Sequence, residues 1–274
     1  MADENEAMRE LLLLRSLYMI LNRTCYLMAD MSLMEYCLVC TVKEHPAGFP
    51  VKAFRTELAT VSTLDYYENQ VLSKELVRRV RDAGDHRALA FSITDKGASL
   101  VDRMDAEMAI ALLEHFPRFT ETDFQQIAEL MADFGRRMDP DAVCTTIFPA
   151  GVLKALNAYR NIAATETSRR SVTFLNLCIF CLAGLNGNTI SVASAARHMD
   201  TPVALFEHNL LSLEERGLME FADDGRVIVL TETGQQRFRL LLGRIASRFS
   251  ALVVSHHTEE PYTALKRYLL YLMG

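Results

Sequence analysis

Apolar side chains recur at three- and four-residue spacing over most of the chain, which predicts a mainly helical fold. A long first helix is expected over residues 7–29 and a second over residues 33–44, where Pro46 and Gly48 follow as a stop. A short third helix should begin near Val51. Thr60 is expected to cap a fourth helix that ends near Leu76, because a threonine hydroxyl can accept a hydrogen bond from the first helical turn.

The next segment, 78–94, alternates around a turn at 82–85 and predicts a β-hairpin. Helical spacing returns from Gly97 to about residue 115, and Thr120 is expected to cap a further helix that reaches Arg137. Two prolines, Pro140 and Pro149, then interrupt the pattern, so residues 139–149 are expected to be a linker.

The chain repeats itself across this linker. A shift of 141 positions places the Cys-x-x-Cys pair of Cys37 and Cys40 on that of Cys178 and Cys181, and Leu72 on Leu213. After the hairpin the shift is 137, and the ordered matches continue as Thr94 with Thr231, Gly97 with Gly234, and, within a residue, Thr120 with Thr258. We therefore expect two related units, 1–138 and 150–274, that bury their apolar faces against each other as a single-chain pseudo-dimer.

The first hairpin resembles the wing of the multiple-antibiotic-resistance regulator (MarR) family. That family has an Asp-x-x-Asp-x-Arg turn followed by a Leu-Thr-x-x-Gly helix entry; Ile93 replaces the leucine here, and the matching residues are Asp82, Asp85, Arg87, Thr94 and Gly97. In the second unit, residues 195–218 resemble the family's helix-turn-helix. Leu76 departs from the pattern, because it stands where the family places a glycine.

The resemblance covers nearly the whole chain. It implies two winged helix-turn-helix units, each with a small β-wing, below a shared helical dimerisation core formed by the first and last two helices of both units. It also implies DNA-binding transcriptional regulation, with two recognition helices entering successive major grooves roughly 34 Å apart. Because the two units differ, an imperfect inverted repeat is the expected operator, and a small ligand is expected to relieve repression.

Residues expected to contact double-stranded DNA are the wing arginines together with polar and basic side chains of both helix-turn-helix segments. In the wing, Asp82 or Asp85 can pair with Arg87 and fix the hairpin, which leaves other arginines for phosphates or a minor groove. The full set is Lys52, Arg55, Ser62, Thr63, Tyr66, Tyr67, Lys74, Arg78, Arg79, Arg81, Arg87, Arg197, Thr201, His208 and Arg226.

Charge favours an alternative function. The net charge is −6, the expected recognition helices carry no Arg or Lys in their first two turns, and Asp65 and Glu68 would face a polyanion. The second hairpin, at 221–226, is short and acidic. A ligand-sensing or protein-interaction protein that kept this scaffold and lost DNA binding in one or both units is therefore the second hypothesis. One continuous basic face would favour DNA binding, and neutralisation by acidic side chains would favour the alternative.

An effector, if bound, is expected to be a small aromatic or phenolic compound held between core and wing. Aromatic side chains could line that pocket and a cation could hold a carboxylate, although aromatic residues at helical spacing more often belong to a core. The candidates are Tyr18, Arg23, Tyr26, Tyr36, His45 and Phe116.

The Cys-x-x-Cys pairs can be interpreted as soft-metal or redox sites, since residues three apart share a helix face. Their apolar intervening residues favour buried core instead. Cys25 can be a thiol sensor or core, and His256-His257 is expected to lie in an exposed loop rather than at a metal. No catalytic motif is found, so we expect no enzyme and no cofactor. The acidic N-terminus and the lack of a long apolar run favour a cytoplasmic protein without a membrane partner.

Overall fold

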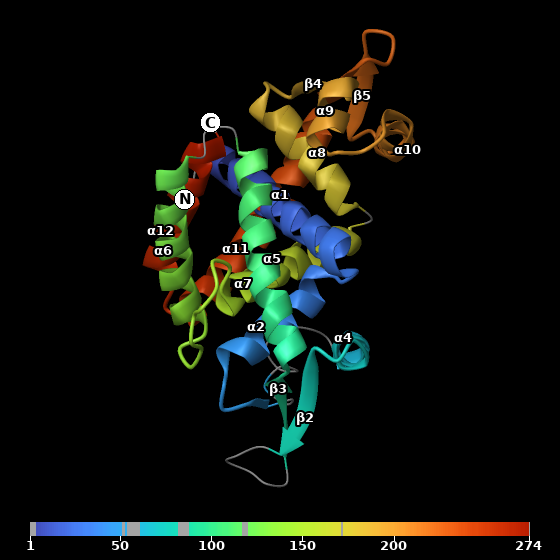
Figure 1. Cartoon of the computed structure of the whole chain (residues 1–274). Helices are drawn as coiled ribbons and strands as arrows, with labels where there is room; N and C mark the ends of the chain where they lie inside the picture. The colour runs from blue at the N-terminus through green and yellow to red at the C-terminus, as the bar shows by residue number, and fades with distance from the viewer. Residues whose placement is uncertain are drawn as a thin grey trace. The chain divides into compact units, whose positions relative to one another are not determined.

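The computed structural model describes residues 4–50, 53, 61–81, 88–116, 120–170 and 172–273. Within these ranges the chain forms eleven helices and two small antiparallel sheets (Figure 1). The expectation of a mainly helical fold is confirmed. Among the described residues, no single helix is both long enough and apolar enough to cross a membrane.

The two halves of the chain have a similar order of elements. The first half contains α1 (Glu4–Ala29), α2 (Leu33–Glu44), β1 (Phe49–Pro50), α4 (Val61–Ser73), β2 (Val77–Arg81), β3 (Leu89–Ile93), α5 (Asp95–His115) and α6 (Glu121–Met138). The second contains α7 (Ala150–Ser168), α8 (Phe174–Leu185), β4 (Thr189–Ser191), α9 (Val192–His198), α10 (Val203–Glu214), β5 (Met219–Ala222), β6 (Val227–Leu230), α11 (Glu232–Ser255) and α12 (Glu259–Met273).

Each sheet has three strands, in the orders β1-β3-β2 and β4-β6-β5. The predicted hairpin corresponds to β2 and β3, which pair from Val77 opposite Ile93 to Arg81 opposite Leu89. The edge strands β1 and β4 were not predicted. They are two and three residues long, too short for the alternation of apolar and polar positions that identifies a strand in sequence.

Contacts divide the chain into two compact units that do not follow the midpoint of the sequence. One unit contains the described residues up to Arg15 together with Asn161–Ala251, and the other contains Ser16–Arg160 together with the residues after Ala251. The helices α1, α7 and α11 therefore contribute residues to both units. The division at the linker expected from the sequence stays a prediction.

The same helix entry follows the hairpin in both halves. Thr94 caps α5, and its hydroxyl accepts a hydrogen bond from the Gly97 amide at 3.0 Å. The Thr231 hydroxyl accepts one from the Gly234 amide at the same distance. A β-carbon on Gly97 would lie 2.1 Å from the carbonyl oxygen of Leu76, so the Thr-x-x-Gly motif lets the start of α5 approach the backbone that precedes β2.

The ends of α4 and α10 show where the sequence alignment of the halves is wrong by one residue. The Leu76 amide donates to the Val71 carbonyl, and the Leu218 amide donates to the Leu213 carbonyl. Val71, rather than Leu72, is therefore the counterpart of Leu213. By the same shift Glu75, and not Leu76, stands at the position of Gly217.

A basic side chain caps the C-terminal end of a long helix in each half. The Lys74 ammonium donates to the carbonyl of Asp30, after α1, and the Arg216 guanidinium donates to the carbonyl of Arg170, after α7, at 3.2 Å. Cations are favoured at helix C-termini, where carbonyl groups lack partners and the helix dipole is negative. This contact ties the end of α4 to α1 and the end of α10 to α7.

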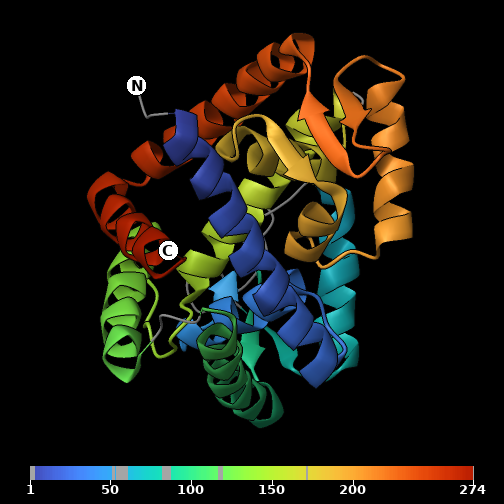
Figure 2. The same ribbon diagram turned by 90° about the horizontal axis from the view of Figure 1, so that it is seen from above.

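In the unit that contains Ser16–Arg160, α6 and α12 pack side by side (Figure 2). The rings of Phe134 and Tyr262 lie 5.7 Å apart, and the Tyr268 hydroxyl donates to Asp123 at 2.5 Å. Thr120 caps α6 as predicted, in a capping box with Asp123. Hydrogen bonds from Thr120 and Tyr268 lower the pKa of the Asp123 carboxyl.

Three further expectations concern element ends. The third helix near Val51 and the cap at Thr60 lie outside the described residues. At the start of α10 the N-cap is Pro202, without a side-chain cap, and the Thr201 hydroxyl donates to the carbonyl of Met199 at 3.0 Å. His256 and His257 lie exposed in the turn between α11 and α12, as predicted.

Candidate nucleic-acid interface

The strand β2 presents three exposed arginines, Arg78, Arg79 and Arg81. It lies beside β3 in the hairpin at the foot of Figure 1, with α4 nearby. Within the described part of the chain, Arg78 and Arg81 form no ion pair. Their guanidinium groups can therefore donate hydrogen bonds to an external anion, and a phosphate accepts such bonds well.

Two other cations expected on this surface have acidic partners. Arg79 lies 3.8 Å from the carboxylate of Glu68, whose side chain is buried. Lys74 lies 3.8 Å from the carboxylate of Glu35 while it caps α1. The Glu68 carboxylate holds Arg79 against α4. Glu68 was expected to repel DNA; here it offsets part of the positive charge of the hairpin.

The aromatic pair of α4 is the other described feature of this surface. Tyr66 is 58% exposed, and its ring meets that of Tyr67 edge-on at 5.5 Å. An exposed tyrosine can stack on a base or donate to a phosphate. The remaining residues expected here lie outside the description: Lys52, Arg55 and Arg87 lie outside the described ranges, and the side chains of Ser62 and Thr63 are not described.

The counterpart surface of the second half carries fewer cations among its described residues. Arg197, in α9, and Arg226, just before β6, are exposed, whereas Thr201 is half-buried. The turn between β5 and β6 contains Asp223 and Asp224, both exposed. The side chain of His208 is outside the description. The described charges therefore make the first hairpin the more basic of the two.

An open groove of about 360 Å³ runs between the C-terminal part of α1 and the end of α5. Its lining combines apolar side chains with a cation, a hydroxyl, a carboxylate and an imidazole. These residues are Ile20, Arg23, Thr24, Leu27, Ala111, Glu114 and His115. Such a lining can hold an apolar ring and pair its acidic substituent with Arg23.

The structure does not gather the six sequence candidates for an effector pocket around one cavity. Arg23 lines the α1/α5 groove, and Tyr26, near it in sequence, is exposed. Tyr36 and Phe116 are buried. The others are Tyr18, whose ring lies 5.2 Å from the Arg160 guanidinium, and His45, which belongs to a polar cluster described below.

Both Cys-x-x-Cys pairs lie in the core. Cys37, Cys40, Cys178 and Cys181 are fully buried, and burial raises the pKa of the Cys37 and Cys178 thiols to about 12. A thiol is nucleophilic and binds metals as the thiolate, which these surroundings disfavour. Cys25 is also fully buried, and burial raises the pKa of its thiol. Burial favours the interpretation of all five as core residues.

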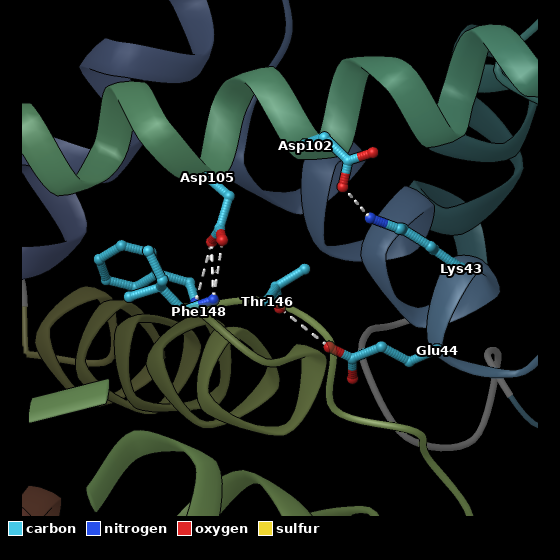
Figure 3. Close-up of polar contacts among 7 residues, drawn as sticks. Lys43, Glu44, Asp102, Asp105, Thr146 and Phe148 are labelled. Carbon is cyan, nitrogen blue, oxygen red and sulfur yellow. Dashed lines mark hydrogen bonds and ion pairs between the residues drawn. The ribbon is translucent and has the colours of Figure 1, made fainter. Parts of the chain in front are cut away.

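A polar cluster that the sequence analysis missed surrounds the segment 139–149 (Figure 3). The Glu44 carboxylate accepts hydrogen bonds from the Thr146 hydroxyl at 3.0 Å and from the Ala150 amide at 3.1 Å. Asp105, on α5, accepts from the amides of Ile147 and Phe148 at 2.9 and 3.2 Å. We call this segment the junction segment and the polar groups around it the junction cluster.

A second part of the junction cluster is charged. Asp139 accepts from the Lys154 ammonium at 2.6 Å and lies 3.3 Å from the Nε2 atom of His45. Lys154 lies over the ring of Phe49, 5.3 Å from its centre. Nearby, Lys43 pairs with Asp102 at 2.5 Å on a more exposed side. The sequence feature that points to this cluster is the charged run 43–45 at the end of an otherwise apolar helix.

Comparison of the sequence with models of known protein families and with curated proteins gives no match.

Proposed function

We propose that the protein is a DNA-binding transcriptional regulator built as a single-chain pseudo-dimer of two winged helix-turn-helix units. The resemblance of its first hairpin to MarR wings supports this proposal, as does the repeated order of helices and strands in the two halves. The observation that carries it is the exposed arginines of β2 beside α4. Phosphate contacts by such arginines would supply affinity, and the helices would supply base contacts.

The binding site is expected to be an imperfect inverted repeat of double-stranded DNA. The halves present different charges, with the arginines of β2 in one hairpin and Asp223 and Asp224 in the other. Two unequal winged helix-turn-helix units would therefore prefer two unequal half-sites. The first half of the chain would make more of the phosphate contacts.

Selection from a pool of random duplex DNA, repeated at two salt concentrations, tests this function. We expect enrichment of an imperfect inverted repeat and an affinity that falls steeply with salt. The double variant Arg78→Ala/Arg81→Ala should lower the slope of log affinity against log salt by about 2, since each lost phosphate contact removes roughly 0.9. Arg267→Ala, which removes an exposed arginine of α12, is the matched control and should leave the slope unchanged.

Ligand sensing or protein interaction without DNA binding is the alternative function. It is favoured by the acidic partners of Arg79 and Lys74 and by the α1/α5 groove. The test of this alternative uses folded protein that native mass spectrometry shows to be free of bound small molecules. If such protein enriches no DNA sequence, the alternative function replaces the proposal of a DNA-binding regulator. Benzoate binding that is weakened by Arg23→Gln would assign an effector site to the groove in either case.

A further inference from the structure

The junction cluster binds the backbone of the junction segment at three points and the first residue of α7 at a fourth. The amides of Ile147 and Phe148 donate to Asp105, and the Ala150 amide donates to the Glu44 carboxylate. In addition, the Val143 amide donates to the Glu44 main-chain carbonyl at 2.8 Å. The conformation of a segment without helix or strand therefore depends on two acidic side chains from α2 and α5.

The surroundings of Glu44 suit its protonated form. Its side chain is fully buried, where an ionised carboxylate loses hydration. A protonated Glu44 can donate to the Thr146 hydroxyl oxygen while its other oxygen accepts from the Ala150 amide, so both contacts persist without a charge. Burial, opposed by these two hydrogen bonds, raises the pKa of the Glu44 carboxyl to about 7.

The surroundings of His45 suit its cationic form. Its Nδ1 atom lies 2.7 Å from the Thr41 carbonyl oxygen and its Nε2 atom 3.3 Å from the Asp139 carboxylate. A neutral imidazole has one N–H, so only the imidazolium can donate to both acceptors. Burial acts to lower the pKa of His45, but hydrogen bonds to Asp139 and Thr41 outweigh it, and the pKa is raised.

We propose that the junction cluster is a proton-operated lock: the junction segment is held while Glu44 is protonated and His45 is cationic, and it loosens when these two protons leave. The Glu44 part of the response begins above the ordinary glutamate pKa of about 4.3 and levels off above about 7. Its portion above pH 6 lies where neither ordinary carboxyl groups nor lysines change charge. The lock goes beyond DNA binding, does not depend on that function, and can be tested without DNA.

The two protons act in the same direction. Glu44 has a raised pKa in the closed state, so ionisation favours opening once the pH exceeds its ordinary value. His45 also has a raised pKa, and the stability that its charge contributes is lost as the pH rises through that value. From the Glu44 shift alone, the opening equilibrium should increase about tenfold between pH 6 and pH 8.

Other titratable and charged groups face Glu44 and His45 from the neighbouring elements. Asp139 faces His45 and Lys154; burial acts to raise its pKa, but hydrogen bonding to His45 and the charge of Lys154 outweigh it, and the pKa is lowered. Asp105, which Lys43 and Asp102 face, has a pKa raised by burial. The Cys144 thiol faces Glu44, and burial raises its pKa to about 11, whereas the Cys37 thiol faces Lys154 and Glu44.

Hydrogen exchange of the full-length protein tests the lock. Protection of the amides at 143–150, corrected for the intrinsic pH dependence of exchange, should fall about tenfold or more from pH 6 to pH 8. Glu44→Gln places an amide where the protonated carboxyl would be and should remove most of this response. Asp102→Asn, the same chemical change on the exposed side of the cluster, should keep the full response.

Two results would overturn the proposal: protection in the natural protein that does not change with pH, or a Glu44→Gln variant that keeps the tenfold response. A direct measurement covers a variant that does not fold. The carboxyl carbon resonance of Glu44 in the unaltered protein should titrate with a midpoint near 7, and a midpoint near the ordinary value of about 4.3 would equally exclude the lock.

Discussion

At the scale of single residues, the glycine after each hairpin shows why the repeat is visible in the sequence. Gly97 and Gly234 lie so close to the carbonyl oxygens of Leu76 and Leu218 that a β-carbon would be 2.1 and 1.9 Å from them. The nearest group is backbone in both cases and cannot rotate away. Only glycine, which has a hydrogen in place of the β-carbon, fits at these two positions. Gly97 and Gly234 therefore match in the two halves although the residues around them differ.

Replacing either glycine should therefore cost stability. We expect Gly234→Ala, and equally Gly97→Ala, to lower the free energy of unfolding by at least ~2 kcal/mol, because the backbone must shift to admit the methyl group. Gly243→Ala is the matched control within α11. It meets nothing within 4 Å and should raise stability by about 0.5–1 kcal/mol through higher helix propensity. Chemical denaturation measures all three, and an equal effect at Gly234 and Gly243 would contradict the packing argument.

Residues whose role depends on partners far away in the sequence could not be predicted from local sequence patterns. Glu44 follows a lysine at the end of a predicted helix, where a carboxylate normally faces water. Its burial results from contacts with Thr146 and Ala150, about a hundred positions later, which no local pattern encodes. The pairing of Glu68 with Arg79 was likewise missed: Glu68 was expected to repel DNA, and it pairs with an arginine of β2 instead.

At the scale of elements, the end of α4 differs from the end of α10 in one chemical respect. Both ends pass through a left-handed residue, which is Gly217 after α10 with φ 64° and Glu75 after α4 with φ 59°. A side chain is disfavoured in this conformation, whereas glycine adopts it without steric cost. The residue of the first half that corresponds to Gly217 is therefore Glu75, one position before Leu76, the position that the sequence comparison indicated.

Glu75→Gly should stabilise the protein. Removing a left-handed side chain gains about 1–2 kcal/mol, and the greater freedom of glycine in the unfolded chain offsets about half of that. The exposed pair of Glu75 with Lys96 contributes little. We expect a net gain of about 0.5–1 kcal/mol by thermal or chemical unfolding. Gly217→Ala, the reverse change in the other half, should lose a similar amount, and two changes of the same sign would exclude this explanation.

The elements themselves were predictable where their pattern is long. Helices such as α1, α2, α5 and α6 follow apolar spacing and caps, and β2 and β3 follow alternation around a turn. The short strands β1 and β4 exist because a neighbouring strand pairs with them, a non-local cause. At the start of α10 the cap residue is Pro202, and Thr201, one position earlier, donates its hydroxyl to the carbonyl of Met199.

At the scale of the whole molecule, neither compact unit is made from one half of the sequence. The unit that contains Asn161–Ala251 also includes the start of α1, where Leu11 and Leu13 are buried. Arg15 donates to the carbonyl of Met199 at 3.1 Å, and Glu4 pairs with Arg239 at 2.7 Å. The second half therefore lacks part of its own core when taken alone. Sequence patterns identify a repeat but not this exchange of segments, because the apolar spacing of a helix does not show which other helix covers its apolar face.

Separate expression of the two halves tests this exchange. Residues 150–274 alone should give no cooperative unfolding transition as a monomer, since the start of α1, with the buried side chains of Leu11 and Leu13, is absent. Adding residues 1–149 should restore a cooperative transition in a one-to-one complex. Calorimetry with analytical ultracentrifugation provides the measurement. A folded monomer of 150–274 with the stability of the full chain would show that the first residues are dispensable.

The inclusion of the start of α1 in the unit of the second half has a consequence for folding during synthesis. The apolar start of α1 is among the first parts synthesised, yet the residues with which it forms a compact unit extend to Ala251. At about 5–20 residues per second, synthesis of the chain between Arg15 and Asn161, where this unit resumes, takes roughly 7–30 s. During that time Leu11 and its neighbours have no native partner from this unit, so the nascent chain is expected to engage chaperones that bind exposed apolar helices.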